Sequence, residues 1–198
     1  MTTQVPKLNF TPDTWCQLNY MCKRASTEIG CFAITHPDDR LFVTDLWFPK
    51  QECTAATVEF DDESIAEEID RLSDTHPMDE CFRIWIHTHP GDSPNPSGTD
   101  EETFSKVLGH FDWAVMAILA KGGKSYARIK HDAPAGITEG KIEYNIPMGM
   151  YTDGYEEWDQ ILEDKVSKRT FQATTKTYPA GGLYGDWDRY YTTKGKLK

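Results

Sequence analysis

A short apolar run from Phe82 to Ile86 does most to limit the folds open to this chain. The run lacks strict alternation of apolar and polar residues, which is typical of a strand that is covered on both faces. It leads directly into His87-Thr88-His89, and residues 90–98 are too rich in proline and glycine for regular structure. A helix is expected to begin near Ser97 to Thr99. The chain must therefore place a buried strand, a rigid loop and a helix in succession.

The remaining elements are predicted from local periodicity and from turn residues. Apolar residues at helical spacing predict helices at about 11–25, 63–72 and 156–166. Apolar and β-branched runs predict strands at 29–35, 41–48, 56–60, 113–120, 125–130 and 137–144. The first two strands form a hairpin, because His36-Pro37-Asp38-Asp39 between them has strong turn chemistry. These patterns indicate an α/β chain of the α+β type, with a mixed central sheet and helices packed on it.

The length of 198 residues suits one domain with a substantial core and an additional segment. We predict a catalytic domain at 1–145 and a C-terminal extension at 146–198. Five aromatic residues of the extension could bind a partner or could fold back onto the domain: Tyr178, Tyr184, Trp187, Tyr190 and Tyr191.

The composition excludes several classes of function. A formal net charge of -11 and a pI near 4.9 argue against nucleic-acid binding, which needs clustered Lys and Arg. No signal-peptide pattern opens the chain, and no stretch approaches the roughly 18 apolar residues of a membrane span, so we expect a cytoplasmic protein. The five cysteines include no C-x-x-C pair, which favours reduced, buried thiols over disulfides or a cysteine-rich zinc site.

His87 and His89 are the first candidates for chemistry. Alternate side chains of a strand share a face, so the two imidazoles can bind one ion. Catalytic zinc uses three protein ligands and one open position, and Asp100, in the first turn of the next helix, is the best third ligand. Two histidines and a carboxylate would also suit ferrous iron.

The segment His87-Thr88-His89-Pro90, six residues, Ser97, two residues, Asp100 resembles the H-x-H-P-x6-S-x2-D signature of the JAMM (MPN+) metalloproteases without a departure. This family also places a catalytic glutamate on an early strand after the first helix, and Glu28 stands at that position. The resemblance covers roughly residues 10–145. It implies an MPN fold, with a curved central sheet, flanking helices and zinc at one strand end.

By the same resemblance, His87, His89 and Asp100 would bind zinc, Glu28 would be the general base, and Ser97 would stabilise the oxyanion. The expected activity is that of a deubiquitinase-like isopeptidase or peptidase, acting after the C-terminal tail of ubiquitin or a ubiquitin-like protein. The short stretch between Asp100 and Trp113 indicates a compact, prokaryote-like or phage-like member. Two alternatives are a non-catalytic MPN scaffold and a metal-dependent hydrolase of a small substrate.

Overall fold

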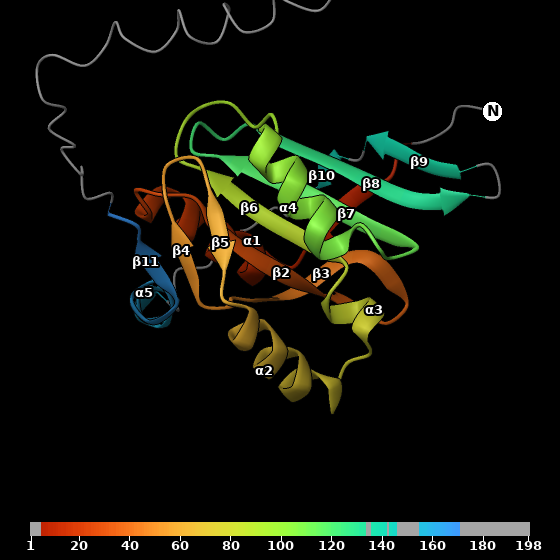
Figure 1. Cartoon of the computed structure of the whole chain (residues 1–198), viewed down its shortest axis with the longest axis horizontal. Coiled ribbons are helices and arrows are strands. Elements are labelled where there is room, and N and C mark those ends of the chain that lie inside the picture. The colour runs from red at the N-terminus through yellow and green to blue at the C-terminus, as the bar shows by residue number, and fades with distance from the viewer. Residues whose placement is uncertain (1–4, 134–135, 142, 146–154, 171–198) are drawn as a thin grey trace, which may run out of the picture.

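The computed structural model describes residues 5–133, 136–141, 143–145 and 155–170 of the chain (Figure 1). The helices are α1 (Pro12–Arg24), α2 (Asp62–Ser73), α3 (Met78–Cys81), α4 (Gly98–Leu108) and α5 (Tyr155–Lys165). The strands are β1 (Lys7–Phe10), β2 (Ile29–His36), β3 (Asp39–Trp47), β4 (Gln51–Cys53), β5 (Val58–Phe60), β6 (Ile84–His89), β7 (Trp113–Ala120), β8 (Ser125–Ala133), β9 (Gly136–Lys141), β10 (Glu143–Asn145) and β11 (Val166–Lys168).

An eight-stranded mixed sheet forms the centre of the molecule, in the order β10-β1-β3-β2-β6-β7-β8-β9. β2 is antiparallel to both β3 and β6, and the strands from β7 to β9 are antiparallel to one another. β6 and β7 run parallel, because α4 lies between them in the chain and returns it to the start of the next strand. The sheet curls and carries helices on its faces (Figure 1), which confirms the predicted α+β class with a curved mixed sheet.

The two faces of β6 belong to different parts of the core. Ile84 and Ile86 are fully buried in a cluster that includes residues of α1. Trp85, between them, is buried in a second cluster that includes Phe104 and Leu108 of α4. The prediction that this strand is covered on both faces is therefore confirmed, and the metal-ligand candidates at its end are carried by a central, well-packed element.

The C-terminal segment is attached to the domain through both of its elements. α5 packs on α1, where the Tyr20 and Trp158 ring centroids are 5.5 Å apart and the Arg24 Nε donates to Asp159 at 3.2 Å. β11 pairs in parallel with β4, which is antiparallel to β5, so the three form a small second sheet. The helix predicted at 156–166 is found at 155–165.

Several predictions fall partly or wholly outside the described residues. The boundary at 145 and 146 borders residues 146–154, which are not described, so the division into domain and extension stays a prediction. The five tail aromatic residues, Tyr178, Tyr184, Trp187, Tyr190 and Tyr191, also lie outside the described residues. Within the described ranges, no helix has the length and apolar character needed to span a membrane.

The five cysteines are free thiols, as the sequence predicted, and all except Cys16 are buried. Burial raises the pKa of the Cys31 thiol far above its usual range. Burial, assisted by the nearby charge of Glu28, raises the pKa of Cys53 to about 12. Both thiols are therefore protonated at neutral pH and are poor nucleophiles and poor metal ligands.

Candidate metal centre

β6 places His87 and His89 on one face at the end of the strand, as expected from their i, i+2 spacing. β6 lies between β2 and β7, so the strand is held by hydrogen bonds along both edges. The His87 side chain is fully buried, and its ring stacks on Trp85 with centroids 4.3 Å apart. His89 is less buried, with its side chain 12% exposed. The site therefore opens to solvent on the His89 side.

Asp100 reaches the two histidines from the first turn of α4. Ser97 is the N-cap of this helix: its hydroxyl accepts the Asp100 N–H at 3.2 Å, and the Asp100 carboxylate accepts the Ser97 N–H at 2.6 Å. This reciprocal capping box fixes the position of the carboxylate. Because α4 covers the face of the sheet that carries Trp85, the buried Asp100 side chain points to the same side as His87 and His89.

The distances between the donor atoms are close to those around one tetrahedral ion, with a different Asp100 oxygen facing each histidine. His87 Nε2 lies 3.2 Å from Asp100 Oδ1 and 3.2 Å from His89 Nε2, and His89 Nε2 lies 3.6 Å from Asp100 Oδ2. Zinc bonds of about 2.0 to 2.1 Å in tetrahedral geometry separate ligand atoms by roughly 3.3 Å. These three residues form a group that could hold a metal ion.

The hydrogen bonds of the histidines also suit metal binding. His89 Nδ1 lies 2.8 Å from the Ser93 carbonyl oxygen, which can only accept, so Nδ1 carries a proton and Nε2 is the nitrogen that faces the site. His87 Nδ1 is buried and has no hydrogen-bond partner among the described residues. Its imidazole stacks on the Trp85 ring and contacts Asp100 through Nε2.

The protonation states of Asp100 and His87 favour a cation at the centre, whereas that of His89 opposes it as the pH falls. Burial lowers the pKa of His87, against an opposing effect of Asp100, so this imidazole is neutral near pH 7. Burial opposes ionisation of Asp100, but hydrogen bonds with His87 and His89 outweigh it and hold the pKa of the carboxyl well below its usual range. The contact with Asp100 raises the pKa of His89, so protons compete with a metal there as the pH falls.

Glu28 immediately precedes β2 and lies at the edge of this donor group. Its Oε1 is 3.6 Å from His89 Nε2, while its Oε2 is buried and has no hydrogen-bond partner among the described residues. Burial, with a smaller contribution from the Asp100 charge, raises the pKa of Glu28 from its ordinary 4.5 to about 7, although nearby His89 acts in the opposite direction. A carboxyl group with this pKa can accept and release a proton at neutral pH.

The structure therefore brings together all five residues that the sequence predicted for the site: Glu28, His87, His89, Ser97 and Asp100. Ser97 is exposed, and its hydroxyl uses an acceptor position for the cap, which leaves its proton available as a donor.

Two residues that fix the start of β2, just after Glu28, were not predicted to have this role. The Gln51 side-chain amide binds both backbone groups of Gly30, accepting from its N–H and donating to its carbonyl at 2.8 Å each. Gly30 itself leaves room for β5, because a Cβ there would lie 2.5 Å from Phe60 Cζ. Neither Gln51 nor Gly30 belongs to a periodic sequence pattern. Their contacts depend on the position of β4 and β5 beside β2, which the sequence does not indicate.

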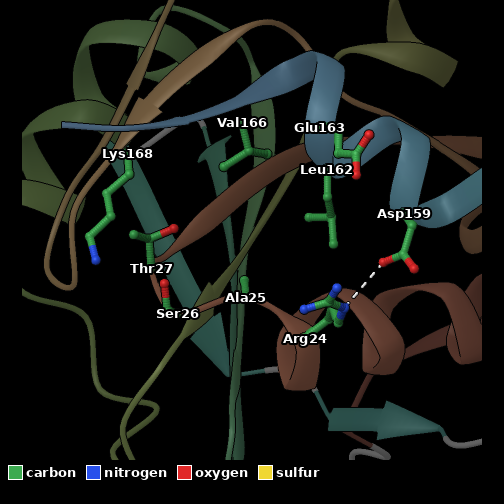
Figure 2. A pocket seen from close by; sticks show the side chains of 9 residues that line it. All are labelled: Arg24, Ala25, Ser26, Thr27, Asp159, Leu162, Glu163, Val166 and Lys168. Atoms are coloured by element: carbon green, nitrogen blue, oxygen red, sulfur yellow. Dashed lines mark hydrogen bonds and ion pairs between the residues drawn. The ribbon is translucent and has the colours of Figure 1, made fainter.

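Two cavities are lined in part by the residues that precede Glu28 and Asp100 in the chain, and neither is lined by a ligand candidate. The first, of about 340 Å³, lies between the end of α1 and the α5–β11 segment, with Thr27 and Lys168 in its lining (Figure 2). The second, of about 260 Å³, is a groove between β5 and α4, with Val58 and Thr99 in its lining. Thr99 directly precedes the ligand candidate Asp100 in the chain.

No family model and no curated protein matches this sequence. Among solved structures, the chain is similar to a solution structure of a protein from Desulfitobacterium hafniense, with 15% identity, a TM-score of 0.40 and coverage of 70% of this chain and 93% of that one. A solution structure of a protein from Salinibacter ruber gives 17% identity, a TM-score of 0.39, and coverage of 73% and 95%. Both likenesses are remote. The fold and the site together define an α+β protein with a candidate metal centre.

Proposed function

We propose that this protein is a zinc metallopeptidase of the JAMM (MPN+) type with an MPN fold, and that it acts as an isopeptidase or peptidase. One observation carries the proposal: donor atoms from His87, His89 and Asp100 lie within 4.8 Å of one another, with the Glu28 carboxylate beside them. The exact sequence match to the JAMM signature supports the same assignment.

The donor set supports zinc as the metal. Two imidazoles and one carboxylate leave a fourth position open, which is the arrangement of catalytic zinc sites. When bound, zinc lowers the pKa of a coordinated water toward neutrality and polarises a carbonyl oxygen. Ferrous iron would accept the same ligands, and metal analysis distinguishes the two.

Glu28 acts as the general base in this proposal. Its Oε2 has no partner among the described residues, so it is free to take a proton from the attacking water. The raised pKa of Glu28 lets the same carboxyl pass this proton to the leaving amine. Ser97 presents a hydroxyl at the N-terminus of α4, where it can donate to the developing oxyanion.

The proposed substrate is the extended C-terminal tail of ubiquitin or a ubiquitin-like protein, either conjugated or as a precursor. β5 is an outer strand of the three-stranded sheet and lines the groove between β5 and α4, which also includes Thr99, the residue before Asp100. An extended peptide can add to such an edge through main-chain hydrogen bonds, which would align its scissile carbonyl with the metal centre. Because Asp100 and Glu28 are almost fully buried, the peptide must be slender where it enters.

The test compares the wild type with Glu28→Gln, and uses Glu63→Gln as a matched control on the exposed first turn of α2. Each protein is analysed for bound metal and incubated with ubiquitin-like fusions that carry a cleavable C-terminal tail. We expect one zinc per chain in all three proteins and cleavage by the wild type and Glu63→Gln alone. Metal-free, inactive wild type, even with added zinc, would favour the scaffold alternative.

A further inference from the structure

The proposed base lies where β2 begins, and there one edge of β2 has no neighbour among the described strands of the eight-stranded sheet. β6 pairs with β2 from Ile29, whereas β3 pairs with it only from Phe32 onward. On the β3 side, the backbone groups of Glu28 and Gly30 therefore need partners from outside this sheet. Whatever binds them also fixes the backbone from which the Glu28 side chain extends.

β4 and the residue after it supply these bonds. The Thr54 carbonyl oxygen accepts the Glu28 N–H at 2.8 Å. At Gly30, the Gln51 side-chain amide takes the place of a strand: its oxygen accepts the N–H and its nitrogen donates to the carbonyl oxygen, each at 2.8 Å. The same nitrogen donates to the Pro49 carbonyl oxygen at 3.1 Å, so both amide protons are used. The Gln51 side chain is buried, so water does not replace these bonds.

The register of β2 and β6 places this bonded backbone next to the ligand candidates. Gly30 lies directly opposite His87, so Gln51, Gly30 and His87 follow one another across the strands. Glu28 is two residues before Gly30 and therefore shares the face that carries His87. Its Oε1 lies 3.6 Å from His89 Nε2. A displacement of the Gly30 backbone thus moves the Glu28 carboxyl relative to the donor group.

β4 is held in turn by the C-terminal strand β11, which lies beside it (Figure 1). The two strands pair in parallel, with Val166 opposite Gln51. The Ser167 hydroxyl donates to the Gln51 carbonyl oxygen at 3.1 Å, and the Arg169 N–H donates to the Cys53 carbonyl oxygen at 3.0 Å. Because β4 has only three residues, its position depends on the two strands that flank it.

One side chain joins all three strands of this small sheet. The Arg169 guanidinium, just after β11, forms ion pairs with Glu52 of β4 at 3.0 Å and with Glu59 of β5. Both carboxylates are more than half exposed, so these ion pairs lie on the surface, away from the buried Gln51 amide. A change at Arg169 therefore perturbs the attachment of β11 without altering the groups that bind Gly30.

We propose that Gln51 is a positioning residue for Glu28 and that β11 keeps Gln51 in place, so that the C-terminal segment controls the proposed base. This inference rests on the proposed function. With β11 paired, the Gln51 amide holds the Gly30 backbone and the Glu28 carboxyl stays beside the donor group. With β11 detached, β4 loses one of its two neighbours and this hold weakens. Metal binding does not depend on this path, because the ligand candidates come from β6 and α4.

Two variants of the full chain test the path at different points. Gln51→Met keeps the length of the side chain but removes the amide, and Gln160→Met makes the same substitution at an exposed position of α5. Arg169→Glu turns two surface ion pairs into repulsions. Its matched control, Lys168→Glu, makes the same charge change on the preceding residue and keeps both Arg169 ion pairs.

Each protein is assayed for cleavage of a ubiquitin-like fusion, for zinc affinity by calorimetry, and for exchange of the Gly30 amide hydrogen by NMR. For Gln51→Met we expect kcat to fall roughly 10- to 100-fold with KM and zinc affinity unchanged, because a misplaced catalytic group affects the reacting step rather than binding. Arg169→Glu should show a smaller fall in kcat of the same kind. The Gly30 amide should exchange faster in both variants, and both controls should match the wild type.

The outcomes separate the positioning role from the proposed function. An unchanged kcat in Gln51→Met, or a fall that is matched by loss of zinc affinity, overturns the positioning role and leaves the proposed function standing. Wild-type kcat and wild-type Gly30 exchange in Arg169→Glu overturn control by β11, and this variant alone decides if Gln51→Met does not fold. A zinc-loaded wild type that fails to cleave the fusion overturns the proposed function and this inference with it.

Discussion

Replacing Glu28 with glutamine is expected to stabilise the metal-free protein at alkaline pH, although it removes the proposed base. The Glu28 carboxyl is buried and its Oε2 has no hydrogen-bond partner among the described residues. Ionisation of this group in the folded protein is therefore unfavourable, because a buried charge has lost its hydration. Glutamine has a similar shape and no charge, so it avoids this destabilising contribution.

The magnitude follows from the raised pKa of Glu28, 4.5 ordinarily and about 7 in the fold. Between these values the folded protein keeps a proton that the unfolded chain has released. The stabilising contribution is thus complete below pH 4.5 and is lost as the pH rises through about 7. At about 1.4 kcal/mol per pH unit, the wild type should lose about 2 to 3 kcal/mol of unfolding free energy between pH 5 and pH 8 that Glu28→Gln keeps.

Urea denaturation in a metal chelator at pH 5 and pH 8 measures this difference, with Glu63→Gln as the control on exposed α2. The stability gap between Glu28→Gln and the wild type should widen toward pH 8, and Glu63→Gln should show no such widening. A gap that is equal at the two pH values, or a variant less stable than the wild type at pH 8, would refute the assignment of Glu28 as a buried, strained carboxyl.

Three further predictions concern the metal centre and the strands that support it. Zinc at about 100 times its dissociation constant should raise the unfolding free energy of the wild type by about 2.7 kcal/mol. The same zinc concentration should stabilise Asp100→Asn much less, and thermal denaturation of both proteins with and without zinc measures the difference. Zinc affinity, measured by calorimetry, should fall as the pH drops through the raised pKa of His89, because its protonated imidazole cannot bind metal. Gly30→Ala should lower the unfolding free energy by about 1 to 3 kcal/mol through the clash with Phe60, whereas Gly98→Ala, with no atom within 4 Å of its Cβ, should not show this clash penalty.

The ligand group could be predicted from sequence because its geometry is local. The i, i+2 spacing of His87 and His89 fixes their common face, and the Ser97 capping box fixes Asp100 on the first turn of its helix. Both rules depend only on residues close in the chain. The sequence also located the helix that ends near Lys165, because its apolar residues recur at helical spacing.

The elements that the sequence did not predict are short and depend on distant partners. β1, β4 and β11 have three or four residues each, too few for a periodic pattern, and each exists because another strand lies beside it. The segment predicted as one strand at 137–144 is divided into β9, which pairs with β8, and β10, which pairs with β1. No local pattern in the sequence indicates this change of partner.

The central position of β6 also bears on how a metal would leave the protein. His87 and His89 lie on β6, a strand that is paired on both edges. Asp100 instead lies in the first turn of α4, at a helix terminus. Helix ends open more readily than central strands, which exchange their amide hydrogens only on global unfolding. Release of the ion would therefore begin with fraying of the α4 start, and amides of that turn should exchange faster than those of β6.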